Sequence, residues 1–306
     1  MSAKENVGEA SIPESPESPV DRPSALAAWL YASRPKTLPA ASSPVISALA
    51  LAWRDIAEGR VGETSFQWIP AVCCVMFAVL AQVAANFIND YADFKKGADG
   101  SERKGPARAV ASGWISPRAM LIGTLGVLAV ACLFGLGTLP YGGMKLILVG
   151  VVCCAFCLLY SVGPFPLSYI GLGDVLVIGF FGVVAVVFTY YLQAQRIGID
   201  SVLLGLALAF ATDNILVANN YRDRDEDRAN GKNTLVALFG ERFGRYMYLT
   251  NGLIVAGLLA ALEIRRGELN AVAVGAVVVY LFLHWRTWRT MVAIGSGKGL
   301  VRILAL

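Results

Sequence analysis

The sequence has few charged residues and almost no histidine. Only 16% of its 306 residues are Asp, Glu, Lys or Arg, whereas 56% are apolar. A soluble domain usually carries about a quarter charged residues, so this composition argues against a soluble fold. The single histidine excludes a metal site built from several imidazoles, and none of the six cysteines has ligand spacing with that histidine or with a second cysteine pair. Oxygen atoms are therefore the ligands that this chain can offer to a metal.

Seven stretches contain little or no charge and are each roughly 17–22 residues long, about the length of a helix that crosses a ~30 Å hydrocarbon layer. They are residues 67–88, 119–139, 144–160, 175–195, 201–221, 246–262 and 269–285. The shorter segment 37–53 contains Pro39 and Pro44 and predicts a kinked first span, because neighbouring helices can satisfy the freed backbone groups. A buried soluble core is the alternative, which seven such runs disfavour. We predict an all-α, polytopic transmembrane helical bundle with eight spans, forming one domain over residues 25–306.

Residues 1–24 lack a hydrophobic stretch and are rich in Glu, Ser and Pro, which predicts a disordered tail rather than a signal peptide. Basic residues are distributed unevenly among the predicted loops. The loops 94–118 and 222–245 each contain six Lys or Arg, whereas each loop on the opposite side contains one or two. The positive-inside rule then places the N-terminus and both basic loops on the cytoplasmic side of a plasma (inner) membrane.

A weak internal repeat carries the first functional indication. Asn89-x-x-x-Asp93 ends the second span, and Asn219-x-x-x-Asp223 ends the sixth, 130 positions later. Four spans separate the two segments, so both emerge on the same face, as in two parallel four-helix repeats around a central cavity. At 100° per residue, each segment places its amides and carboxylates on one stripe about 100° wide. The stripes are Asn86, Asn89, Asp90 and Asp93, and Asn219, Asn220, Asp223 and Asp227.

The two polar stripes predict a metal–diphosphate site. Carboxylates near the hydrocarbon boundary cost about 2–3 kcal/mol each unless they face a wet cavity, so the stripes should face each other around a cation. Mg²⁺ fits best, because it combines a few carboxylates with waters and phosphate oxygens. Basic side chains near both stripes suit the same diphosphate, whereas Arg118, Arg242 and Arg245 are interpreted as solvated. The predicted metal ligands are Asp90, Asp93, Asp223 and Asp227, and the predicted diphosphate-binding cations are Arg103, Arg108, Arg222 and Lys232.

The loop between the fourth and fifth spans is rich in Gly and Pro and contains one acid, Asp174. Tyr160 begins this loop and is predicted to contribute to the substrate site. Asp174 is either the N-cap of the fifth span or a residue that orients or deprotonates a phenolic hydroxyl of an acceptor. Arg34 and Lys36, just before the first span, could pair with a carboxylate of that acceptor, although basic residues there also serve as orientation signals.

These patterns together resemble the UbiA-type intramembrane prenyltransferase superfamily. Its first motif, Asn-Asp-x-x-Asp-x-x-x-Asp, is matched by Asn89, Asp90 and Asp93, with Gly97 in place of the last acid, and its second motif, Asp-x-x-x-Asp, by Asp223 and Asp227. In having glycine at this last motif position, the sequence resembles the 1,4-dihydroxy-2-naphthoate prenyltransferase branch of the superfamily. Four further segments also resemble that branch: Arg34-Pro-Lys-Thr-Leu, Arg103-x-Gly-Pro-x-Arg, Tyr169-x-Gly-Leu-Gly-Asp and Asp227-x-x-x-Gly-Lys-Asn-Thr-Leu. Pro164 stands where the 4-hydroxybenzoate branch usually has a lysine, which argues against that acceptor.

The resemblance implies a lipid-embedded enzyme with nine helices, the ninth following Leu306. It implies Mg²⁺-dependent transfer of a polyprenyl group from its diphosphate to 1,4-dihydroxy-2-naphthoate, with loss of CO₂ and diphosphate, giving a demethylmenaquinone. The expected catalytic residues are Asp90, Asp93, Asp223, Asp227 and Asp174, and no nucleic-acid partner is expected. The alternatives are another aromatic acceptor or, in a different class, a secondary transporter with intramembrane acids. An alcohol phosphotransferase is disfavoured, because its Asp-Gly motif is absent.

Overall fold

The computed structural model describes residues 23–97, 106–297 and 299–301. Within these ranges every regular element is helical, which confirms the all-α prediction. The predicted N-terminal tail lies outside the described residues apart from its last two positions. The elements are α1 (Ala25–Ser33), η1 (Pro35–Thr37), α2 (Leu38–Ala57), α3 (Trp68–Lys95), α4 (Pro117–Leu136), α5 (Leu139–Gly142), α6 (Lys145–Leu159), η2 (Leu167–Tyr169), α7 (Gly173–Val177), η3 (Ile178–Val184), α8 (Ala185–Ala194), α9 (Ile199–Ala229), α10 (Leu235–Phe239), α11 (Glu241–Arg266) and α12 (Ala271–Ile294).

A helix stands at each of the eight predicted spans. Six helical stretches in the described chain are long and apolar enough to cross a membrane: α3, α4, the continuous run of α7, η3 and α8, α9, α11 and α12. The predicted first and fourth spans form α2, with Pro44 inside it, and α6, an apolar helix of 15 residues. A multi-pass bundle is therefore confirmed, whereas the number of eight spans stays a prediction.

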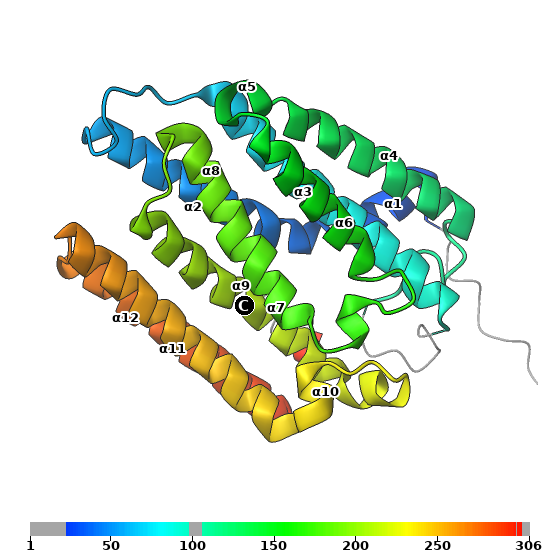
Figure 1. The fold of residues 1–306 in the computed structure, drawn as a ribbon. Helices are drawn as coiled ribbons and strands as arrows, with labels where there is room; N and C mark the ends of the chain where they lie inside the picture. The colour runs from blue at the N-terminus through cyan, green and yellow to red at the C-terminus, as the bar shows by residue number, and fades with distance from the viewer. Residues whose placement is uncertain (1–22, 98–105, 298, 302–306) are drawn as a thin grey trace, which may run out of the picture.

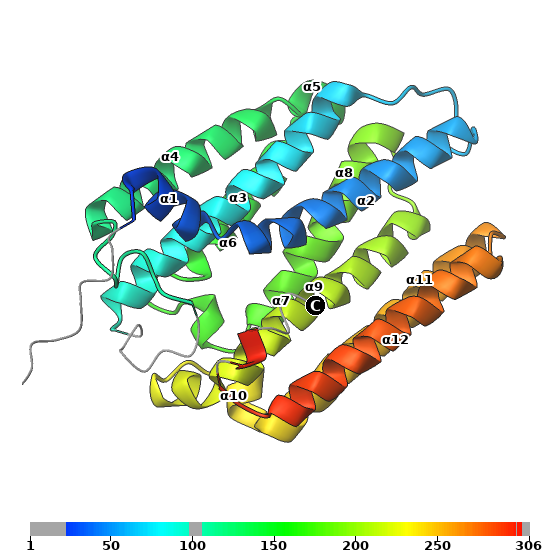
Figure 2. The same cartoon turned by 180° about the vertical axis from the view of Figure 1, so that it is seen from behind.

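The helices pack as an oblique bundle whose long axes run roughly alongside one another (Figure 1). Helix α3 packs mainly on α4, and α9 mainly on α11, so the second and third spans of each predicted half pair in the same way. The α11–α12 hairpin forms one flank and α4 the opposite flank, as the view from behind also shows (Figure 2). Large apolar side chains on the flanks are exposed, among them Val272 (82%) and Ile122 (71%). Such surfaces suit contact with lipid chains.

A glycine brings the fifth span against the sixth. Gly182 lies in η3, a π-helical stretch, where a Cβ atom would stand 2.1 Å from Cβ of Ala209 and 2.5 Å from the carbonyl oxygen of Gly205 on α9. Only a residue without a side chain fits this contact. The two helices run in opposite directions, because Gly173 at the start of α7 faces Leu216, farther along α9. The beginning of α7 is thereby held beside the middle of α9.

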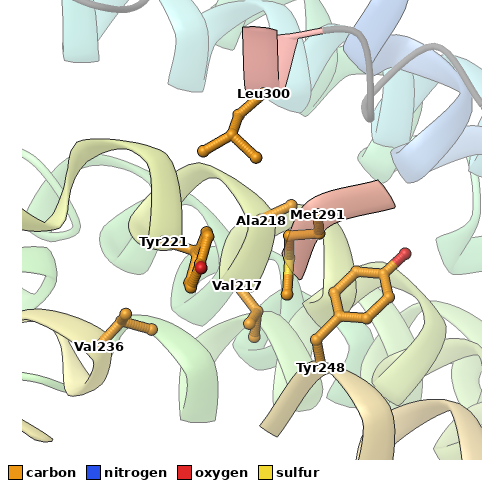
Figure 3. Packing of buried hydrophobic residues seen from close by; sticks show 7 residues of the cluster. All are labelled: Val217, Ala218, Tyr221, Val236, Tyr248, Met291 and Leu300. Carbon is orange, nitrogen blue, oxygen red and sulfur yellow. The ribbon is translucent and has the colours of Figure 1, made fainter. Parts of the chain in front are cut away.

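The end of α9 is anchored by an apolar cluster (Figure 3). Val217, Ala218 and Tyr221 on α9 pack with residues of four following segments: Val236 on α10, Tyr248 on α11, Met291 on α12, and Leu300 after α12. Tyr221, Val236 and Met291 are completely buried. This packing fixes the last turns of α9, which carry the second acidic cluster.

Candidate functional site

The two acidic helix ends lie at the same end of the bundle, where α3 ends, α7 begins and α10 packs on α9 (Figures 1 and 2). Two contacts join the loops around them. The backbone N–H of Asn233 donates to the carbonyl oxygen of Tyr169 at 3.0 Å. Lys96 Nζ donates to the carbonyl oxygen of Ser161 at 3.2 Å and lies 3.6 Å from the ring centroid of Tyr169. The phenol of Tyr160 lies within electrostatic reach of Asp93 and Asp227, one acid from each cluster.

The first cluster contains a network centred on Arg108. Its guanidinium donates to Oδ1 of Asn89 at 2.7 Å and to Oδ2 of Asp93 at 2.6 Å. Arg34 also donates to Oδ1 of Asn89, at 3.4 Å, and Asn89 donates to the hydroxyl of Ser161 at 3.4 Å. Arg108 is 7% exposed. The predicted cation Arg108 therefore meets the predicted acid Asp93, and Arg34 meets Asn89 beside it, while Arg103 lies outside the described residues.

Asp90 faces the loop that carries Arg108. Its two oxygens accept the backbone N–H groups of Ala109 and Val110 at 3.0 and 3.2 Å, and the side chain is 1% exposed. In this structure Asp90 therefore fixes the basic loop against α3. Its role as a metal ligand stays a prediction.

Asn86 holds the elbow between α1 and α2. Its amide donates to the carbonyl oxygen of Ser33 at 2.8 Å and to the hydroxyl of Thr37 at 3.1 Å, on either side of Arg34. Arg34 has the left-handed backbone conformation (φ 51°) that this elbow requires. Asn86 thus positions Arg34 toward the first cluster. Lys36, in the same elbow, is exposed.

In the second cluster both acids of the motif, Asp223 and Asp227, are paired with a cation. Arg222 donates from Nε and Nη2 to the two oxygens of Asp223, both at 2.6 Å. Lys232 Nζ lies 3.2 Å from Oδ1 of Asp227, and its backbone N–H closes the turn onto the Asp227 carbonyl oxygen at 2.8 Å. Oδ2 of Asp227 is buried and has no hydrogen-bond partner. Asn219 lies one turn before Asp223 and is partly exposed.

The carboxylates are not gathered into a ready metal cage. Among the described residues, no group of three or more His, Cys, Asp or Glu side chains is close enough to hold a metal ion. The donor set nevertheless suits Mg²⁺, because it offers oxygen atoms only and Oδ2 of Asp227 lacks a partner. Partial desolvation lowers the pKa of Lys96, a cation near Asp93 that the sequence analysis used only as part of the charge bias. Arginine and lysine side chains at this end also suit a diphosphate.

Asp174 is not the N-cap of the fifth span. The cap position is Leu172, and Asp174 lies in the first turn of α7, where it is 3% exposed. Its carboxyl group lies within interaction distance of that of Asp213 on α9. Asp213 is completely buried and accepts a hydrogen bond from the amide of Asn251 on α11 at 2.8 Å.

Asp213 and Asn251 belong to a polar group that the sequence analysis missed. Asp213 is the one charged residue in the apolar run 201–221. An acid inside a membrane span marks a functional site by default, so this signal was present in the sequence. What could not be seen is which residue of another helix Asp213 meets.

Comparisons with known proteins agree with this architecture. The profile of the UbiA prenyltransferase family matches residues 41–293. The chain is 38% identical to the 1,4-dihydroxy-2-naphthoate octaprenyltransferase of Mycobacterium tuberculosis, covering 76% of each chain. It is 36% identical to the enzyme of the same name from Escherichia coli, covering 70% of this chain and 69% of the relative.

Among solved structures, a UbiA homolog from Archaeoglobus fulgidus bound to DMAPP and Mg²⁺ superposes with a TM-score of 0.60 at 12% identity, over 90% of this chain and 96% of that one. At this identity the likeness concerns the fold. The fold, the matched profile and the two acidic helix ends lead to one conclusion: this chain belongs to the UbiA prenyltransferase family.

Proposed function

We propose that this protein transfers a polyprenyl group from its diphosphate to 1,4-dihydroxy-2-naphthoate, with loss of CO₂ and diphosphate, giving the reduced (quinol) form of a demethylmenaquinone. The main support is the meeting of two acidic helix ends, each lined with Arg or Lys, at one end of the bundle. The relatives named for this reaction match over 69–76% of their length. The proposed location is a plasma (inner) membrane, with this end of the bundle on the cytoplasmic side, where the basic loops lie.

The proposed donor site uses both clusters. Asp90, Asp93, Asp223 and Asp227 are the proposed Mg²⁺ ligands, and a related structure bound DMAPP and Mg²⁺. Bound Mg²⁺ would supply Lewis-acid stabilisation of the leaving diphosphate. When a diphosphate enters, Arg108 and Arg222 can turn from Asp93 and Asp223 to its oxygens, because a guanidinium fork matches phosphate as well as carboxylate. The ion pairs Arg108–Asp93 and Arg222–Asp223 keep both guanidinium groups near the proposed diphosphate position.

The remaining site residues serve binding and exclusion of water. Asn86, Asn89 and Asn219 complete the polar stripes. Arg34 is proposed to pair with the acceptor carboxylate, together with Lys36. Tyr160 lies within electrostatic reach of both acidic clusters and of Asp174, and is assigned to the proposed acceptor site. The apolar bundle interior would enclose the prenyl chain and keep water away from the allylic cation.

The first test is the metal dependence of diphosphate release. Purified protein with a prenyl diphosphate and the naphthoate should release diphosphate only when Mg²⁺ is present. We expect Asp93→Ala and Asp227→Ala to lower this rate by at least about 10²–10³-fold, because each removes charge stabilisation from the transition state. Asp225→Ala is the matched control on α9, since its side chain is 62% exposed, and should keep the wild-type rate. Normal activity in both Ala variants would remove the donor-site proposal.

A second experiment separates the alternatives. A panel of aromatic acids with one fixed prenyl diphosphate, followed by the mass of each product, identifies the acceptor and the loss of CO₂. A product that keeps its carboxyl group, or a preference for a benzoate acceptor, would overturn the naphthoate assignment. Proton- or sodium-coupled uptake by vesicles containing the protein, without any prenylated product, would instead establish the transporter.

A further inference from the structure

Two buried carboxyl groups meet inside the bundle, away from the acidic helix ends. Asp174 comes from the first turn of α7 and Asp213 from the middle of α9, ten residues before Asp223, which is about 15 Å along a helix. They are 3% and 0% exposed, and their carboxyl groups lie close enough to interact with each other. The approach of η3 to α9 at Gly182 holds them together.

Two ionised carboxylates in contact in a buried place repel each other strongly, so the pair holds one proton between them. The group that steadies the pair is neutral: Asn251 donates one amide N–H to Oδ2 of Asp213 at 2.8 Å. Because the amide adds no positive charge, it does not remove the need for that shared proton. The pair can therefore accept a second proton or release the one that it has.

Each carboxyl group also has an oxygen that lacks a hydrogen-bond partner. Oδ1 of Asp174 and Oδ1 of Asp213 are both buried and unsatisfied. Nearly all buried polar atoms in proteins have a partner, and one proton shared by the pair can satisfy only part of this need, so the pair has room for a further donor. A hydroxyl group of a bound molecule is the donor that fits a carboxylate lone pair.

Tyr160 links the pair to the donor site. Tyr160 packs against Gly173, the residue before Asp174. Its phenol lies within electrostatic reach of Asp174 and Asp213 as well as of Asp93 and Asp227. A molecule beside Tyr160 would therefore lie between the carboxyl pair and the two acidic clusters.

We propose that the Asp174–Asp213 pair receives the hydroxyl proton of the aromatic acceptor while the new carbon–carbon bond forms, and returns this proton after CO₂ has left. Asp174 is the group that contacts the hydroxyl, and Asp213 is a positioning residue that shares the proton with it. This inference rests on the proposed transfer to a hydroxynaphthoate.

The atoms and charges balance in two steps. First, the ring carbon that bears the carboxylate forms a bond to the allylic carbon as the C–O bond to diphosphate breaks. The neighbouring hydroxyl becomes a carbonyl, and its proton goes to the carboxyl pair. The intermediate is a β-keto carboxylate. Second, its bond to CO₂ breaks, the electron pair forms an enolate, and the enolate takes the proton back from the pair to restore the aromatic hydroxyl.

The test compares donor binding with transfer in Asp174→Asn and Asp213→Asn. We expect both to bind the prenyl diphosphate with Mg²⁺ as the wild type does, because neither residue lies in the acidic clusters. We expect kcat for transfer to fall about 10²–10⁴-fold, the usual range for loss of a general base. The double variant should lose no more than the worse single variant, since the pair acts as one unit.

The matched control is Asp200→Asn, which makes the same change at the other end of α9, where Asp200 pairs with Arg265. It should keep kcat within about twofold. If Asp213→Asn does not fold, Asn251→Ala takes its place. Asn251→Ala removes the hydrogen bond that orients the Asp213 carboxyl group, so it should lower kcat about tenfold and leave the donor affinity unchanged.

The outcomes separate the inference from the proposed function. If the wild type transfers the prenyl group and Asp174→Asn and Asp213→Asn do so at near-normal kcat, the proton-sharing pair is excluded and the proposed function stands. If these variants lose donor binding together with transfer, the pair belongs to the donor site and the inference is also wrong. If the wild type itself prenylates no hydroxylated aromatic acid, the proposed function fails first.

Discussion

Arg108 and Arg222 occupy corresponding places in the two clusters. Each forms a short ion pair with an acid of the motif, Asp93 or Asp223, and each is less than 10% exposed. A buried guanidinium that keeps its partner carboxylate close can exchange that partner for phosphate with little loss of ordering. The residue type matters here, because lysine lacks the planar fork that donates two parallel hydrogen bonds.

At the residue scale, we therefore predict that Arg222→Lys weakens donor use. Losing one charge-assisted hydrogen bond of about 1.5–3 kcal/mol should raise KM for the prenyl diphosphate about tenfold or more, with a smaller effect on kcat. Steady-state kinetics with varied donor and saturating acceptor measures this. Arg242→Lys, at an exposed position on α11, is the control and should leave KM unchanged. An unchanged KM in Arg222→Lys would show that this guanidinium stays with Asp223 during catalysis.

Among the contacts between elements, the one between η3 and α9 has the largest effect on the geometry of the proposed site. The π-helical stretch lies between the turn that carries Asp174 and the rest of the fifth span. Gly182 sets how closely this stretch approaches α9, and hence the contact between Asp174 and Asp213. A side chain at position 182 would separate the two helices, because backbone and Cβ atoms of α9 cannot move aside as a flexible side chain would.

At this scale, Gly182→Val should destabilise the protein by about 1–3 kcal/mol and reduce transfer more than donor binding. Thermal unfolding in detergent, donor binding and kcat measure the three effects. Gly179→Ala, in the same π-helical stretch, is the matched control, because a Cβ there meets nothing within 4 Å. Equal behaviour of the two variants would mean that the helices can shift without cost.

At the scale of the whole molecule, the end opposite the acidic clusters is held by an ion network. Arg266 at the end of α11 contacts Asp55 of α2 at 2.8 Å and Asp200 of α9 at 3.2 Å, and Tyr190 of α8 donates to Asp55 at 2.6 Å. The Arg266 side chain is only 2% exposed. Four helices from both halves of the chain are joined here, while the other end of the bundle keeps the ion pairs proposed to open toward substrate.

We predict that Arg266→Met lowers stability by about 3–5 kcal/mol, because it leaves the buried Asp55 without its cation. The melting temperature should fall, whereas kcat measured well below that temperature should stay near the wild-type value. Arg265→Met is the matched control: Arg265 is 54% exposed with one ion pair to Asp200, so its loss should cost about 0–1 kcal/mol. A large loss of kcat in folded Arg266→Met would show that the two ends of the bundle are coupled.

Much of this protein could be predicted from the sequence, because its strongest signals are local. Apolar runs as long as a bilayer is thick predict helices, and the spacing of Asn89 with Asp93 and of Asn219 with Asp223 predicts polar stripes on them. Loop charge predicts a common face. Each of these patterns depends on residues within a few turns of one another, so no knowledge of the other helices is needed.

Only the tertiary structure decided which side chains meet across helices. Both oxygens of Asp90 bind the backbone of the loop after α3. Asp174 lies in the first turn of α7 rather than at its N-cap. Asp174 also lies close to Asp213, which in turn binds Asn251. The tertiary structure also gathered Asp55, Tyr190, Asp200 and Arg266 into one network. Such contacts depend on the rotation and close approach of packed helices, which a single glycine at position 182 helps to set and which no local pattern encodes.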